Sequence, residues 1–205
     1  HLVNGNQVQG TLRQLMDKAS MNGKFVVQKM YKMLMPTFEK VAWKNIVMHR
    51  SIHPRHKFIL WLAVQRRLAT VERLMKFGIQ VPVECCFCRQ NDETFEHLFF
   101  ECQVTRSIWQ RLLAWMGYNR QIQDWTEEIK WICQLAKSKG RQQQVMCCIF
   151  GMIASTLWKS RNQQRFQKKP VQIELILKEV VLHVHIRGRE DMKWRQFLET
   201  RPRLP

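Results

Sequence analysis

The feature that most constrains the fold of this 205-residue chain is a cluster of four potential metal ligands in one short stretch. The stretch "CCFCRQNDETFEHLFFEC", residues 85–102, contains the pattern Cys85-x2-Cys88-x8-His97-x4-Cys102. A Cys-x2-Cys pair places two sulfurs on one tight turn, with the spacing that tetrahedral zinc accepts. Four protein ligands would leave no position for water, which indicates a closed structural site rather than a catalytic one.

The spacing leaves alternatives open. His97 and Cys102 are five residues apart, about 140° of rotation on an ideal α-helix, so both reach one ion only if the helix ends or bends between them. Cys86 is too close to Cys88 to be a second ligand on the same ion. Buried free cysteines beside a hydrogen-bonded histidine are the alternative to a metal, whereas a redox Cys-x-x-Cys would need a βαβ context that is not visible. The odd total of seven cysteines and the lack of a secretory signal pattern favour a reducing, intracellular setting.

Helical periodicity dominates the rest of the chain, and glycine and proline are sparse. We predict an all-α fold of about eight helices, with a small CCHC zinc-stabilised loop between the two halves. The segment from Phe38 to Val47 continues an apolar patch that Pro36 interrupts, and the helix opened by His53-Pro54 is apolar nearly all round, which predicts a central position. Asn91 or Asp92 is expected to cap the helix that carries His97. Positions expected in the core are Cys133, Cys147, Cys148, Trp43, Trp61, Trp109 and Trp158.

Two further predictions concern the second half of the chain. The run "VVLHVHI" alternates like a strand, but its flanks favour a helix that ends at Gly188. The stretch "GYNRQIQDW", residues 117–125, is the one plausible boundary, which divides the chain into residues 1–116 and 117–205.

The charge balance points to a polyanionic partner. The sequence has 34 Lys and Arg against 16 Asp and Glu, a net charge of +18. Nucleic acid is the first candidate partner and an anionic membrane surface the second. No apolar run approaches the ~18–20 residues of a membrane span.

The charge is unevenly distributed. Residues 77–102 hold one Lys or Arg against five Asp and Glu, whereas 49–76 hold seven against one and 141–169 hold six against none. We therefore expect phosphate contacts on the flanking helices and not on the ligand loop. The alternative is that these cations are solvated helix faces that support solubility. The candidate nucleic-acid-binding residues are Arg50, Arg55, His56, Lys57, Arg66, Arg67, Lys159, Arg161, Arg165, Lys168 and Lys169.

Several motifs together resemble the zinc-binding domain found C-terminal to the reverse transcriptase of plant LINE-type (non-LTR) retrotransposons. They are "GKFVVQKMYKML", "VAWKNIV", "HPRHKFILWLAVQRRLATVERLMKFGI", the ligand stretch and "RSIWQRLLAW", and they cover residues 23–116. A weaker echo follows at "LWKSRNQQRF", residues 157–166. The resemblance places Cys85, Cys88, His97 and Cys102 at the zinc ligand positions.

The resemblance implies a non-catalytic module. Paired polymerase aspartates and nuclease carboxylate clusters are missing, so we do not expect an enzyme. We expect binding of nucleic acid, RNA in preference to DNA, with no membrane association. The alternative is a host-recruited structural RNA-binding subunit that works among other proteins of a ribonucleoprotein, such as a mitochondrial ribosome. The location would be the nucleus for a retroelement protein and the mitochondrion or another organelle for a recruited one.

Overall fold

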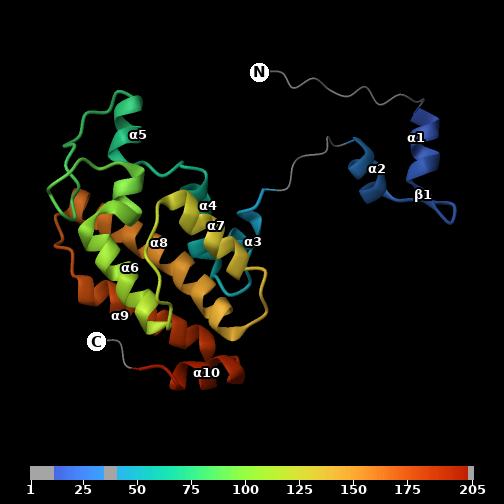
Figure 1. The fold of residues 1–205 in the computed structure, drawn as a ribbon. Helices are drawn as coiled ribbons and strands as arrows, with labels where there is room; N and C mark the ends of the chain where they lie inside the picture. Colours follow the sequence, from blue (N-terminus) through green and yellow to red (C-terminus); the bar gives the residue numbers. More distant parts are fainter. Residues whose placement is uncertain (1–11, 35–40, 203–205) are drawn as a thin grey trace. The chain divides into compact units, whose positions relative to one another are not determined.

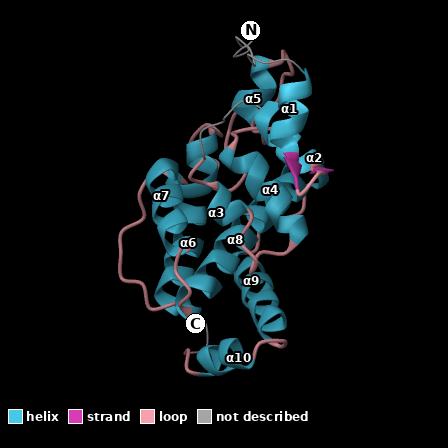
Figure 2. Ribbon diagram, turned by 90° about the vertical axis from the view of Figure 1, so that its right-hand side faces the viewer, coloured by secondary structure: helices cyan, strands magenta, loops and turns pink. Residues whose placement is uncertain are grey.

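A computed structural model describes residues 12–34 and 41–202 (Figure 1). The chain forms two compact units, His1–Val41 and Ala42–Pro205. Among the described residues eight helices have seven residues or more, and the only strands are one two-residue pair (Figure 2). The prediction of an all-α fold of about eight helices is confirmed.

The first unit is a helical pair joined by a β-hairpin. Helix α1 (Leu12–Ala19) leads into β1 (Ser20–Met21), β2 (Lys24–Phe25) and α2 (Val27–Leu34). Asn22 and Gly23 both have positive φ, +50° and +72°, which is the backbone geometry of a two-residue type I′ hairpin turn. The predicted continuation at Phe38 lies outside the described residues.

The second unit holds the remaining helices. They are α3 (Lys44–Val47), α4 (Pro54–Val64), α5 (Val71–Lys76), the π-helical turn η1 (His97–Glu101), α6 (Gln103–Trp115), α7 (Trp125–Leu135), α8 (Arg141–Gln167), α9 (Ile173–Gly188) and α10 (Met192–Glu199). Helix α8 packs against α4, α6, α7, α9 and α10 (Figure 1). All its residues from 144 to 157 are buried, so α8 is the central helix of the unit.

The prediction that the helix after His53 is central is therefore wrong. Helix α4 buries only His56, Leu60 and Ala63, and its Phe58 is 59% exposed. An apolar sequence on all sides does not distinguish a central helix from one that presents part of its apolar surface outward. The expected start of α4 is confirmed, because Nδ1 of His53 accepts a hydrogen bond from the backbone of Arg55 at 3.3 Å.

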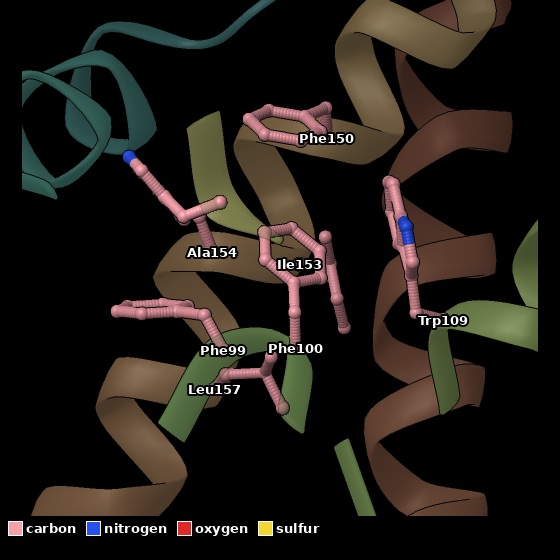
Figure 3. Close-up of a pocket in the computed structure, with 8 residues that line it drawn as sticks. Phe99, Phe100, Trp109, Phe150, Ile153, Ala154 and Leu157 are labelled. Atoms are coloured by element: carbon pink, nitrogen blue, oxygen red, sulfur yellow. The ribbon is translucent and has the colours of Figure 1, made fainter. Parts of the chain in front are cut away.

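An aromatic cluster joins the ligand-bearing segment to α8. Phe99 and Phe100 of η1, Trp109 of α6 and Phe150 of α8 line one small void (Figure 3). Trp125 of α7 completes the cluster, with ring centroids 4.8–5.7 Å from the phenylalanines of residues 95–100. The void left between them is about 10 Å³ and almost wholly apolar, so the packing is close and dry.

Residues on both sides of the stretch 117–125 contribute to this one core. Trp109 lies before the stretch and Phe150 after it, and their rings are 5.5 Å apart. The second compact unit accordingly runs across the boundary drawn from the sequence. The run "VVLHVHI" is helical within α9, as its flanks predicted. The predicted core positions are also confirmed: the cysteines and Trp109 are buried, and Trp43, Trp61 and Trp158 pack against the core.

Candidate metal centre

The structure brings Cys85, Cys88, His97 and Cys102 together. Their ligand atoms all lie within 4.8 Å of one another. The sulfurs of Cys85 and Cys102 are 4.0 Å apart, and the Cys88 sulfur lies 3.2 Å from Nε2 of His97. A zinc tetrahedron with Zn–S bonds of about 2.3 Å requires ligand separations of about 3.8 Å, so the cluster fits that ion. Cys86 is outside the cluster, and its sulfur faces the backbone carbonyl of Arg161 at 3.9 Å.

The turn η1 explains how His97 and Cys102 reach one point. The backbone N–H of Cys102 donates to the carbonyl of His97 at 2.8 Å, which is the i to i+5 bond of a π-helix. Residues five apart are stacked in this geometry, whereas an α-helix would separate them by about 140°. Cys102 then has an extended backbone, φ −62° and ψ 127°, and α6 starts after it. The spacing required the helix to bend or to end between the two ligands. The π-helical turn provides the bend, and the extended backbone of Cys102 ends the helical segment.

The helical segment that holds His97 starts at a residue the sequence did not single out. Oγ1 of Thr94 accepts from the backbone N–H of His97 at 3.0 Å and caps it. The prediction of Asn91 or Asp92 as the cap is wrong, because both belong to the closed loop before it. Asn91 accepts the backbone N–H of Cys85 at 2.7 Å, and Asp92 forms a β-bridge with Glu84.

Backbone amides and hydrogen bonds prepare the sulfurs for a cation. The hydrogen bond from the Cys85 thiol lowers the pKa of Cys102 to about 5, and the amides of Thr105 and Val104 at the start of α6 act in the same direction. Backbone amides of Phe87 and Cys88 point to the Cys85 sulfur. The hydrogen bond to Cys102 and burial raise the pKa of Cys85, so the pair favours one thiolate, at Cys102, the form in which cysteine binds zinc.

A buried carboxylate clamps the ligand loop to α8. Glu93 is fully buried, and its oxygens accept from Nε and Nη2 of Arg161 at 3.0 and 2.6 Å and from Nη2 of Arg165 at 2.9 Å. Glu93 also accepts the backbone N–H of Val71 at the start of α5, at 3.1 Å. Arg165 donates further to the carbonyls of Pro82 and Glu84. We call these three charged side chains, Glu93, Arg161 and Arg165, the buried clamp.

The clamp corrects part of the predicted nucleic-acid surface. Arg161 is 1% exposed and Arg165 is bound on three sides, so the prediction that they contact phosphate is wrong for this structure. The same holds for His56, which is 4% exposed. The cause is that α8 has no acidic residue between 141 and 169, so its inward-facing arginines find their counter-charge in the acidic ligand loop.

The other predicted residues are spread over the second unit. Arg66 and Lys159 form partly exposed ion pairs with Glu96 and Glu179, and Lys57 is half-buried. The remaining five are exposed and have no carboxylate partner among the described residues: Arg50, Arg55, Arg67, Lys168 and Lys169.

Sequence reasoning missed Glu93, although a signal for it was present. The ligand segment is acidic and the stretch 141–169 is basic, and we interpreted the two as separate roles. Opposite charges in two segments of one fold also predict a contact between them. The motif "LWKSRNQQRF", residues 157–166, contains both arginines of the clamp, so it binds the ligand loop through Glu93.

Residues 25–109 match the family model described as zinc-binding in reverse transcriptase. Comparison with curated proteins and with solved structures finds no match. Within residues 12–34 and 41–202, no helix is both long and apolar enough to cross a membrane. The Cys₃His cluster is consistent with Zn²⁺, as predicted. Over residues 25–109 this chain is therefore similar to the zinc-binding domain of reverse transcriptases.

Proposed function

We propose that the chain is a non-catalytic, zinc-stabilised module that binds nucleic acid through the phosphate backbone. In this proposal zinc holds the ligand loop in place, and exposed cations of the second unit make the contacts. RNA is the preferred partner. The LINE-type origin suggested by the sequence motifs agrees with this role.

One observation carries the proposal: most of the positive charge of the described residues has no carboxylate partner among those residues. Ion pairs engage ten of the 32 Lys and Arg in residues 12–34 and 41–202. An excess of this size destabilises a compact fold by self-repulsion unless an external polyanion neutralises it. Phosphates of a nucleic acid supply that charge at regular spacing.

The charge of the metal centre supports separate roles for the zinc site, which stabilises the fold, and for the basic helices, which bind phosphate. Three thiolates on one Zn²⁺ carry a net charge of −1, and the ligand loop is itself acidic. A phosphate backbone gains nothing by approaching such a site. The centre acts on binding only indirectly, because η1 and α6 contribute to the core that positions the basic helices.

The test is a titration of the zinc-loaded chain with labelled RNA at several salt concentrations. We expect the logarithm of the binding constant to fall linearly with that of the salt concentration, by several hundred-fold or more between about 50 and 200 mM for six or more contacts. An affinity that does not change over this range would overturn the proposal. Parallel titrations with DNA of the same sequence test the preference for RNA.

A second candidate is a structural subunit of a large ribonucleoprotein, such as a mitochondrial ribosome. The observation that favours it is an exposed apolar stripe on α9, formed by Leu175, Leu182 and Ile186 at helical spacing. Exposed apolar surface on a basic protein suits a position inside a particle. Sedimentation of native extracts separates the candidates: a chain that travels with an RNA particle supports the second, and a free chain excludes it.

A further inference from the structure

We infer that an open cleft at the start of α8 is the principal phosphodiester-binding site, and that its ligand is the backbone of base-paired nucleic acid. This inference rests on the proposed function and names a site within it. The cleft has a volume of about 650 Å³ and lies between two parts of the second unit. One wall is α3 with the turn after it, residues 44–50, and the other is the turn between α7 and α8, residues 136–141. Helices α3 and α7, which lie next to these two walls in the sequence, pack against each other (Figure 1).

The lining of the cleft is cationic. Lys44 and Arg50 stand on the first wall, and Lys137, Lys139 and Arg141 stand on the second. No carboxylate lines it, and the three lysines are exposed and have no ion-pair partner among the described residues. Four of these five cations have no carboxylate partner among the described residues, so they repel one another, and an anion in the hollow relieves that repulsion.

The floor of the cleft is a built polar site. Gln144 is 4% exposed, and its Oε1 accepts from Nη1 of Arg141 at 3.0 Å and from Nη2 of Arg50 at 3.4 Å. Its Nε2 donates to the carbonyl of Lys139 at 2.9 Å. One buried carboxamide thus holds an arginine from each wall and fixes the turn that carries the lysines.

Two neighbouring features orient the ligand. Arg141 and Gln144 belong to the first turn of the 27-residue α8, so the positive end of that helix dipole adds to the charge of the cleft. On the far side of the arginines lies a second hollow with Arg187, but Glu190 and Asp191 line it, and Asp191 pairs with Arg141 at 2.8 Å. A phosphate chain is therefore favoured along the lysine side.

The class of nucleic acid follows from what the lining lacks. No phenylalanine, tyrosine or tryptophan lines the cleft, and its one ring is the half-buried imidazole of His49, whose Nδ1 accepts a hydrogen bond from the backbone of Ser51. Single-strand binders gain about 1–3 kcal/mol per base by stacking successive bases on aromatic side chains, and the cleft offers no row of large rings for such stacking. A duplex keeps its bases stacked internally and presents only phosphates and sugars, which suits a cleft of lysines and arginines.

Four of the five cationic residues of the cleft lie outside the set proposed from the sequence: Lys44, Lys137, Lys139 and Arg141. Lys168 and Lys169, which belong to that set, lie at the opposite end of α8, about 40 Å away at 1.5 Å per residue. The two locations can therefore be tested separately.

The experiment compares two triple variants of the full zinc-loaded chain. The cleft variant is Lys44→Gln, Lys137→Gln and Lys139→Gln. The matched control removes three exposed lysines of the first unit, Lys24→Gln, Lys29→Gln and Lys32→Gln. Binding of a short RNA duplex is measured by fluorescence anisotropy as a function of salt, and circular dichroism and zinc content verify that both variants are folded.

We expect the cleft variant to lose on the order of 100-fold in affinity near 0.1 M salt, with a salt slope lower by about three, and the control to change by less than about tenfold. Equal losses of affinity in both variants would overturn the assignment of the cleft as the binding site, but would not contradict the proposed function. No binding by the unmodified chain would overturn both.

Two competition arms test the nature of the ligand. Inorganic tripolyphosphate should compete with the duplex only at concentrations far above those of the duplex, because a small anion spans fewer cations. Strong competition at equal phosphate concentration would identify a small-anion site and overturn the inference. Single-stranded RNA should bind more weakly than the duplex, and the reverse order would overturn the choice of a base-paired ligand.

Discussion

The buried clamp can be tested by removing one charge. Glu93→Gln keeps the shape of the side chain, removes its charge, and turns one acceptor oxygen into an N–H donor that faces an arginine. The unmodified carboxylate is fully buried and accepts from Arg161 at 2.6 and 3.0 Å, from Arg165 at 2.9 Å and from the backbone of Val71 at 3.1 Å. Two arginines would then lie in the interior of the protein without their counter-charge.

The expected cost is large. Breaking a buried ion pair by removing one partner destabilises a protein by about 3–5 kcal/mol. In a unit of this size each kcal/mol lowers the melting temperature by about 2–4 °C, which gives a decrease of roughly 6–20 °C. The assay is denaturant and thermal unfolding in excess zinc, followed by tryptophan fluorescence. Release of zinc to a chelator should be faster as well, because Glu93 lies inside the ligand loop.

The matched control is Glu96→Gln. Glu96 pairs with Arg66 in the same segment, but their side chains are 32% and 48% exposed, so the change should cost about 1 kcal/mol or less. If Glu93→Gln costs no more than Glu96→Gln, the clamp does not stabilise the fold. A double-mutant cycle with Arg161→Gln should give a coupling of about 1–3 kcal/mol, whereas additive effects would show that the two side chains act independently.

Three further predictions concern the metal, pH and helix packing. Cys88→Ser should abolish stoichiometric zinc, measured by elemental analysis, and loosen residues 83–102 in hydrogen exchange; a fully loaded variant would exclude this ligand. Burial and the nearby charge of Arg55 lower the pKa of His56 to about 4. The free energy of unfolding should therefore be highest above about pH 6.5 and decrease as the pH falls toward 4, because the unfolded chain then binds a proton that the folded chain does not. The variant His56→Leu should lose less stability over this range, and an equal loss would contradict the prediction. Gly151→Ala would bring a methyl group within 2.7–2.9 Å of Ile52 and should cost about 1–3 kcal/mol in chemical denaturation, with partial rescue by Ile52→Ala; a neutral effect would show that the two segments separate freely.

The ligand set was predictable because its information is local. Two sulfurs on one turn and a histidine and a cysteine further along are recognisable from spacing alone. The spacing of His97 and Cys102 also showed that the helix must bend or end between them. It did not predict a π-helical turn, because such turns have no simple sequence signature. The cap at Thr94 was missed for a related reason: Asn91 and Asp92 are equally good capping residues, and only the backbone pairing of the loop removes them.

The clamp and the cleft were not predictable, because both depend on contacts distant in sequence. Glu93 and Arg161 are 68 residues apart, and the two walls of the cleft are separated by about half the chain. Charge counts by segment could not tell an inward-facing arginine from an outward-facing one. The order of burial within α8, where residues 144–157 are enclosed, follows from the packing of other helices around it.

The clamp also shows that the matched domain and the folding unit do not coincide. A fragment cut at residue 109, where the family match ends, would retain all four zinc ligands and Glu93 but lose both arginines that neutralise this carboxylate. Such a fragment would still chelate zinc, yet it would carry an orphaned negative charge beside an already anionic centre. The zinc ligands and the positive charges that hold their loop in place therefore lie in separate stretches of this polypeptide, and a minimal expression fragment must include α8.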